Sequence, residues 1–214
     1  MSGVSDHTEI GGAVDSSLPN LVLLGFMGTG KTTVGRRLAS WLNCGFFDTD
    51  DEVERRMGTS ISDIFAQQGE PFFRELEASI VRDLAATPGK IIATGGGVVL
   101  NPENLRVLRR HGWLISLVAD AETIYERVIQ ENNRPLLAGD NPMEKIRELL
   151  AARDKQYRSA DLVVDITNLS MSQIVGSIIE WVMVTQSSLA PRHKSWWHLP
   201  VSYTHLTLPT NREV

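Results

Sequence analysis

The chain has 214 residues, of which 42% are hydrophobic and 22% are charged, and its net charge is −5 at pH 7. The length is enough for one ordinary α/β domain, and the acidic balance argues against nucleic acid or an anionic membrane as the main partner. Cys44 is the single cysteine, which excludes an internal disulfide and is typical of a reducing compartment. Residues 1–20 lack the features of a signal peptide, and no apolar run is long enough to span a membrane, so we expect a cytoplasmic protein.

Both ends of the chain differ in composition from the segment between them. Residues 1–18 are rich in Gly, Ser and Asp without periodicity, which predicts a disordered leader. Residues 19–185 are expected to form the domain, and residues 186–214 an unstructured tail, because they contain three prolines and no amphipathic period. One back-translation of residues 201–210 resembles a transposon adapter used for sequencing libraries. We therefore interpret residues 201–214 as a read-through artefact.

From Leu21 onward, short apolar runs alternate with longer amphipathic segments. The apolar runs predict strands, at residues 21–26, 44–50, 90–94, 113–119 and 161–166. The intervening segments predict helices, at residues 31–43, 51–58, 60–69, 70–86, 101–112, 121–132, 143–160 and 170–184. Buried strands that alternate with helices predict an α/β fold of three layers, in which helices cover both faces of a five-stranded parallel sheet.

A glycine-rich loop follows the first predicted strand. The stretch GFMGTGKT, Gly25 to Thr32, matches G-x-x-x-x-G-K-[ST] without a gap and leads into a helix. Such a loop curls so that backbone N–H groups point at phosphate oxygens, and the helix N-terminus adds partial positive charge. Lys31 is expected to reach the β- and γ-phosphates, and the Thr32 hydroxyl to ligate Mg²⁺. We therefore predict a nucleoside triphosphate site with contacts from Gly28, Thr29, Gly30, Lys31, Thr32 and Thr33.

An acidic cluster, GFFDTDDE, lies at the end of the second predicted strand. The strand KIIAT, where many related folds place an Asp, instead ends in the glycines 95–97, so the carboxylate that organises Mg²⁺ is expected from the cluster. Asp48 and Asp50 would point to the same side of an extended chain, whereas Asp51 is expected to begin a helix. Helix capping is an alternative role for all three acids, and it is an adequate explanation for Asp51 alone.

Five short motifs occur in order: DTD after the loop, FR-x-x-E in a helix, GGG after a strand, RPLL in a loop, and R-x-x-x-Y before the last strand. Over about residues 21–184 the ordered set resembles the shikimate kinases, in the nucleoside-monophosphate-kinase-like branch of P-loop folds. The resemblance implies a P-loop kinase fold with a mobile lid, and transfer of the γ-phosphate of ATP to the 3-hydroxyl of shikimate, on the route to chorismate and aromatic amino acids. It implies Mg²⁺ as cofactor and ATP and shikimate as partners. Nothing in the sequence demands a dimer, so we expect a monomer.

The resemblance also implies the residues of an acceptor site. Asp50 would hydrogen-bond the acceptor ring and orient or deprotonate its attacking hydroxyl. Arg74 and Arg153 would pair with the substrate carboxylate, as arginine forks do, and Glu77 would steady the site. Backbone contacts to the substrate are expected from Gly95, Gly96 and Gly97.

On the nucleotide side, the resemblance implies that Asp48 assists Thr32 at the Mg²⁺ site and that Arg127 lies near the adenine. Arg134 would be carried by the mobile lid and touch the transferring phosphate, so that catalysis depends on Lys31, Asp50 and Arg134. The family often carries an arginine near the adenine just after the last strand. Here that region reads DITNLSMS, with Asn168 and no arginine, which leaves the adenine contacts open.

Two alternative functions remain open. Another small-molecule P-loop kinase, for example one acting on gluconate, would share Lys31 and the lid arginine but need not pair Arg74 with Arg153. A non-catalytic, shikimate-kinase-like domain that senses a ligand would be indicated by loss of the lysine, the DTD acids or the lid arginine. None of these is lost.

Overall fold

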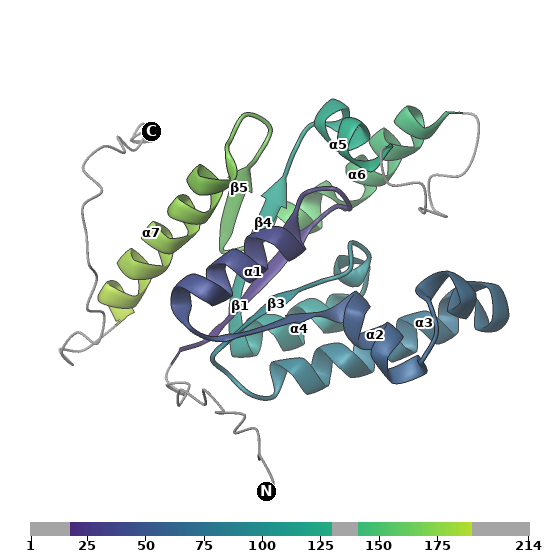
Figure 1. The fold of residues 1–214 in the computed structure, drawn as a ribbon, viewed down its shortest axis with the longest axis horizontal. Coiled ribbons are helices and arrows are strands. Elements are labelled where there is room, and N and C mark those ends of the chain that lie inside the picture. Colours follow the sequence, from purple (N-terminus) through teal and green to yellow (C-terminus); the bar gives the residue numbers. More distant parts are fainter. Residues whose placement is uncertain (1–17, 130–140, 190–214) are drawn as a thin grey trace, which may run out of the picture.

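The computed structural model describes residues 18–129 and 141–189, and its ribbon is a sheet between two layers of helices (Figure 1). Residues 1–17 of the predicted leader, the loop residues 130–140 with Arg134, and the tail beyond Leu189 lie outside the described residues. The elements in chain order are β1 (Asn20–Gly25), α1 (Lys31–Leu42), β2 (Gly45–Asp48), α2 (Thr49–Met57), α3 (Ile61–Ala85), β3 (Lys90–Ala93), the 3₁₀ turn η1 (Val98–Leu100), α4 (Pro102–His111), β4 (Gly112–Val118), α5 (Ala121–Val128), α6 (Pro142–Arg158), β5 (Leu162–Asp165) and α7 (Met171–Leu189).

The sheet has the strand order β2-β3-β1-β4-β5, and every neighbouring pair is parallel. All six residues of β1 are buried, and their side chains alternate between the two faces. Val22 and Leu24 pack in a core with α3, α4, α5 and α6, whereas Leu21 and Leu23 pack in a core with α1 and α7. The predicted three-layer α/β fold is confirmed, and the carboxyl ends of the strands, where ligands bind in such sheets, lie along one edge.

The prediction for the acidic cluster was wrong in one respect. The strand β2 ends at Asp48 and the helix α2 begins at Thr49, so Asp50 is helical and does not continue an extended chain. Asp48 causes the change, because its carboxylate accepts a hydrogen bond from the Asp50 N–H at 3.0 Å and caps the helix. The three acids that follow suit the positive end of the helix dipole. Capping therefore explains Asp48 as well as Asp51.

The bounds of two helices differ from the predicted ones. The helices predicted at 60–69 and 70–86 are joined in α3, but Gly69 breaks the helical path with φ 80° and ψ 173°. The last helix, α7, continues to Leu189, four residues past the expected domain boundary, and the Ser187 hydroxyl donates to the Met183 carbonyl. No proline lies between Met171 and Pro191, so no proline in residues 185–189 stops the helix. Within the described ranges, no helix is both long and apolar enough to cross a membrane.

Candidate active site

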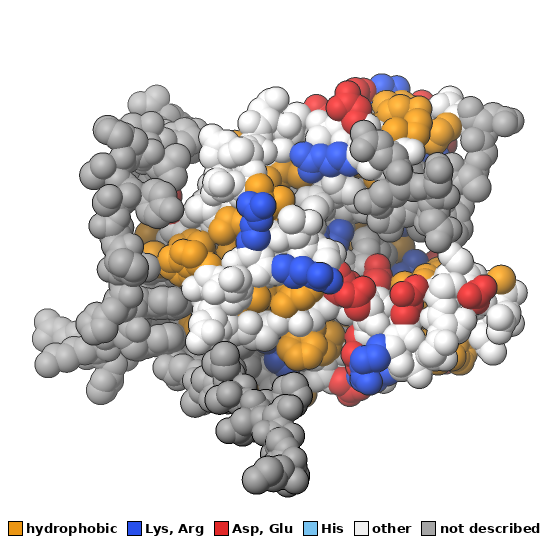
Figure 2. Space-filling model, in the orientation of Figure 1, with side chains coloured by type: hydrophobic (Ala, Val, Ile, Leu, Met, Phe, Trp, Pro, Cys, Tyr) orange, Lys and Arg blue, Asp and Glu red, His pale blue; other side chains and the backbone are white. Residues whose placement is uncertain are grey.

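A hollow of about 730 Å³ opens at the carboxyl ends of the strands β1, β2 and β3. In the space-filling view, acidic side chains gather near α2 and α3, beside basic side chains from neighbouring elements (Figure 2). Of the predicted site residues that the structure describes, all except Thr29 line this hollow. They are Gly28, Gly30, Lys31, Thr32, Thr33, Asp48, Asp50, Arg74, Gly95, Gly96, Gly97, Arg127 and Arg153.

The glycine-rich loop is held in a conformation that only glycine adopts readily. Gly28 and Gly30 have φ angles of 77° and 79°. The Lys31 Nζ donates to the Phe26 carbonyl at 2.9 Å and spans the loop. Gly30 makes no side-chain cap for α1, and the first turn of α1 contains no acidic residue. The N-terminal N–H groups of this helix are therefore suited to an anion.

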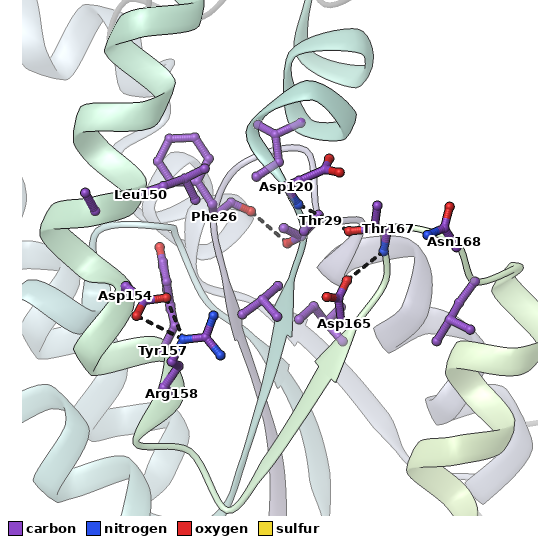
Figure 3. Close-up of a pocket in the computed structure, with 16 residues that line it drawn as sticks. Phe26, Thr29, Asp120, Leu150, Asp154, Tyr157, Arg158, Asp165, Thr167 and Asn168 are labelled. Atoms are coloured by element: carbon purple, nitrogen blue, oxygen red, sulfur yellow. Dashed lines mark hydrogen bonds and ion pairs between the residues drawn. The ribbon is translucent and has the colours of Figure 1, made fainter. Parts of the chain in front are cut away.

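Unlike the neighbouring loop residues Gly28 and Gly30, Thr29 does not line the main hollow. It is buried, and both its N–H and its hydroxyl donate to the Phe26 carbonyl, at 3.3 and 2.7 Å. Its side chain instead lines a second hollow of about 570 Å³ among α5, α6 and the ends of β4 and β5 (Figure 3). Asn168, in the segment where the family often carries an arginine, lines this second hollow as well. The Thr29 hydroxyl thus stabilises the conformation of the glycine-rich loop.

The Asp48 carboxylate links the loop to the acidic cluster. One of its oxygens accepts a hydrogen bond from the Thr32 hydroxyl at 2.7 Å, and the other caps α2 at the Asp50 N–H. Two oxygen groups of the kind that Mg²⁺ prefers thus lie in contact beside the N-terminus of α1. Among the residues that the structure describes, no group of three or more His, Cys, Asp or Glu side chains could hold a metal ion.

Two of the three glycines after β3 make room for neighbouring side chains. A Cβ atom on Gly95 would lie 2.5 Å from the Asp50 Oδ1, and one on Gly97 would lie 2.4 Å from the Arg74 Nη1. The Gly95 N–H also donates to the buried Thr49 hydroxyl at 2.8 Å, which fixes the start of α2 against this turn. The glycine run therefore sets how closely Asp50 and Arg74 approach the same stretch of backbone.

Arg74 is held by two glutamates on its own helix. Its Nη1 donates to both oxygens of Glu77, at 3.2 and 3.0 Å, and its Nε and Nη2 donate to the Glu70 Oε1, at 3.2 and 3.1 Å. Glu77 was expected beside Arg74, and the two are in contact. The contact with Glu70 was not predicted, although the i, i+4 spacing of Glu70 and Arg74 was a usable signal.

Glu77 is a buried carboxyl, with 2% of its side chain exposed. Burial raises its pKa to about 7; the neighbouring Asp50 adds to the rise, while Arg74 and Arg153 oppose it. This carboxyl therefore changes its charge near neutral pH, inside the hollow.

Arg153 and Tyr157, on consecutive turns of α6, both donate to the Gly96 carbonyl, at 3.1 and 2.8 Å. The Arg153 guanidinium is buried and lies 5.5 Å from the centre of the Phe26 ring. Burial raises the pKa of Tyr157 to about 12, so its hydroxyl remains a donor. Phe26 and Tyr157 line the second hollow (Figure 3).

Arg127, on α5, lies across the glycine-rich loop from α1. Its Nη1 donates to the Gly28 carbonyl at 3.4 Å, and its side chain lines the main hollow. The loop carbonyl thereby fixes a cation beside the predicted phosphate site.

Comparison with known proteins identifies a family. The family model described as shikimate kinase matches residues 27–183. A shikimate kinase from Pelotomaculum thermopropionicum is 48% identical over 165 residues, which cover 77% of this chain and 96% of the relative. The solved structure of shikimate kinase from Acinetobacter baumannii in complex with shikimate has a TM-score of 0.76 and 35% identity, and covers 82% of this chain and 97% of that one. A gluconokinase structure from Sinorhizobium meliloti has a TM-score of 0.54 and 16% identity, covers 80% and 95% of the two chains, and shares the fold alone.

Proposed function

The chain belongs to the shikimate kinase family, and we propose that it transfers the γ-phosphate of ATP to the 3-hydroxyl of shikimate through the residues of the main hollow. The observation that carries this assignment is the contact set around residues 95–97. Gly95 lies against Asp50, the Gly96 carbonyl accepts from Arg153, and Gly97 lies against Arg74. One turn of backbone thus gathers a carboxylate for a hydroxyl and two guanidinium groups for a carboxylate.

The nucleotide is assigned to the glycine-rich loop. The N–H groups at the start of α1 would receive the β- and γ-phosphates, and Lys31 would neutralise charge as it develops on the transferred group. Arg127, held at the Gly28 carbonyl, would lie on the nucleoside side of the loop. Arg134, expected to approach the γ-phosphate, lies outside the described residues.

The residues present fit Mg²⁺. Thr32 and Asp48 offer adjacent oxygen donors, and Mg²⁺ is commonly bound through one or two protein groups together with substrate phosphates and water. These two residues would hold the ion, which when bound supplies positive charge to the phosphate oxygens. The Asp48 oxygen that caps α2 would keep this carboxylate in position.

Asp50 would act on the acceptor. Its carboxylate would accept the proton of the 3-hydroxyl as the oxygen forms its bond to the γ-phosphorus and the bond between that phosphorus and the ADP oxygen breaks. Arg74 and Arg153 would hold the ring by its carboxylate, so that the reacting oxygen stays in line with the phosphate.

The alternative of a gluconate kinase is less well supported, because the gluconokinase structure shares only the fold with this chain. The paired arginines also favour an acceptor whose carboxylate is fixed on a rigid ring, since two guanidinium groups held at one turn offer one orientation.

The test is a coupled assay of ADP release by the full chain with MgATP and, in turn, shikimate, quinate and gluconate. We expect turnover that depends on shikimate and exceeds that with either of the other acceptors. The absence of shikimate-dependent turnover would falsify the assignment, and faster turnover with gluconate would support the alternative.

A further inference from the structure

We propose that Glu70 is a competitor of the substrate carboxylate: it holds the Nε and Nη2 of Arg74 in the free enzyme and must release them when an anionic acceptor binds. This inference rests on the proposed function, because it concerns how the acceptor reaches Arg74. It assigns Glu70 a positioning role that sets the affinity for the acceptor without taking part in phosphoryl transfer.

Every nitrogen of the Arg74 guanidinium already donates a hydrogen bond. Nε and Nη2 donate to one oxygen of Glu70, and Nη1 donates to both oxygens of Glu77. A guanidinium recognises a carboxylate best through two parallel N–H groups on one edge. Nη1 and Nη2 each carry a second N–H, but the Nε/Nη2 edge is occupied by Glu70, so a carboxylate that binds to this edge through two parallel N–H groups has to displace Glu70.

The two glutamates differ in how easily each can release Arg74. The Glu77 side chain is 2% exposed and is surrounded by Arg74, Asp50 and Arg153, so its removal from Arg74 would leave a buried carboxyl without its main partner. The Glu70 side chain is 58% exposed. Water can replace Arg74 as its partner, and exposed ion pairs of this kind contribute little. Glu70 is therefore the glutamate that yields.

The helix α3 is broken immediately before Glu70. Gly69 leaves the helical path immediately before Glu70, so Glu70 and Pro71 lie in the first turn of the second helical segment. A carboxylate at the start of a helix is stabilised by the dipole, and proline is well suited to this position. After Glu70 has released Arg74, its carboxylate is therefore still stabilised by the helix dipole. A substrate carboxylate placed beside Arg74 would also repel Glu70.

The experiment compares Glu70→Gln with Glu75→Gln in the full chain. Glu75 lies on the same helix, is exposed, and forms no ion pair with Arg74, so its substitution removes the same charge without touching the proposed competitor. For Glu70→Gln we expect the KM for shikimate to fall by about two- to five-fold, the range for loss of an exposed ion pair. The KM for MgATP and kcat should change by less than twofold, and Glu75→Gln should leave all three constants unchanged.

A second readout separates competition for Arg74 from a general effect of charge. The dissociation constant of shikimate methyl ester, which has no carboxylate charge, should not improve in Glu70→Gln, whereas that of shikimate should. Glu70→Ala provides a second variant with the same expectation. An unchanged or raised shikimate KM in both Glu70 variants would overturn the proposal, and so would an equal fall in Glu75→Gln. If the parent chain itself gives no shikimate-dependent turnover, the proposed function fails, which is a separate result.

Discussion

The two halves of the main hollow are built in different ways. The phosphate half, residues 25–33, is one continuous stretch that joins β1 to α1, and its shape depends on left-handed glycines and on Phe26, whose carbonyl accepts from Thr29 and Lys31. The acceptor half consists of Asp50, Arg74, Glu77, Arg153 and residues 95–97, which come from α2, α3, α6 and the turn after β3. A local motif can specify the first half, but only tertiary packing can specify the second.

This difference leads us to expect that substitutions in the acceptor half separate the kinetic constants. A change there should alter the constants for shikimate and leave the KM for MgATP nearly unchanged, because Arg74 hydrogen-bonds to Glu70 and Glu77, and Arg153 to the Gly96 carbonyl, all outside residues 25–33. A substitution of the acceptor half that weakened both substrates equally would contradict the division.

The largest expected effect is that of Asp50→Asn. Loss of a group that accepts the hydroxyl proton should lower kcat by roughly a hundred-fold or more, while the fold is retained. The matched control is Asp51→Asn, because Asp51 is the next residue of α2 and forms its ion pair with Arg36, on α1, at 3.7 Å. Steady-state kinetics and circular dichroism of both variants check this, and similar kcat values for the two would place the proton acceptor elsewhere.

The next effect is that of Arg74→Ala. Removal of a charge-assisted contact to the acceptor carboxylate should raise the KM for shikimate by roughly ten- to a hundred-fold, with a smaller change in kcat. Initial rates over a range of shikimate concentrations at saturating MgATP measure the change. Arg82→Ala, further along the same helix, is the control and should behave like the parent.

A smaller and more selective effect is expected from the glycine run. Gly97→Ala would place a Cβ 2.4 Å from the Arg74 Nη1, so Arg74 must move and the KM for shikimate should rise by about tenfold. Gly95→Ala would press on the Asp50 Oδ1 instead, and should lower kcat. The control is Gly96→Ala, whose Cβ would meet no atom closer than 3.4 Å. Equal effects at all three positions would mean that the backbone of the turn, not its side-chain neighbours, is what alanine disturbs.

The smallest effect concerns stability. The pKa of Glu77 is raised from 4.5 to about 7 by burial, so the folded state binds more protons than the unfolded state between these values. The contribution of Glu77 to the free energy of unfolding is fully present below pH 4.5 and is lost as the pH rises through about 7. Relative to Glu77→Gln, the parent should lose on the order of 1–3 kcal/mol between pH 4.5 and 7.5. Urea unfolding of both at several pH values measures this, and parallel pH profiles would exclude Glu77 as the source.

The difference between a local motif and tertiary packing also explains which features could be predicted from the sequence. The alternation of apolar runs and helices, and the loop from Gly25 to Thr32, depend on neighbours in the chain, and their predictions for the fold are confirmed. The extended geometry expected at Asp48 and Asp50 was wrong because a single capping hydrogen bond turned the chain into a helix two residues early. The contacts of Gly95 with Asp50 and of Gly97 with Arg74 depend on the packing of α2 and α3 against the turn after β3, which no local pattern encodes. The Glu70 contact, in contrast, had a local signal in its i, i+4 spacing from Arg74.

The Asp48 carboxylate connects the two halves of the main hollow. One oxygen accepts from Thr32 in the phosphate half, and the other accepts from the N–H of Asp50 in the acceptor half. The two substrates are thus linked through a single carboxylate, and any shift of Asp48 on nucleotide binding is also a shift in the cap that positions Asp50. Thermodynamic reciprocity then requires the acceptor to change the affinity for nucleotide by the same factor as nucleotide changes the affinity for the acceptor.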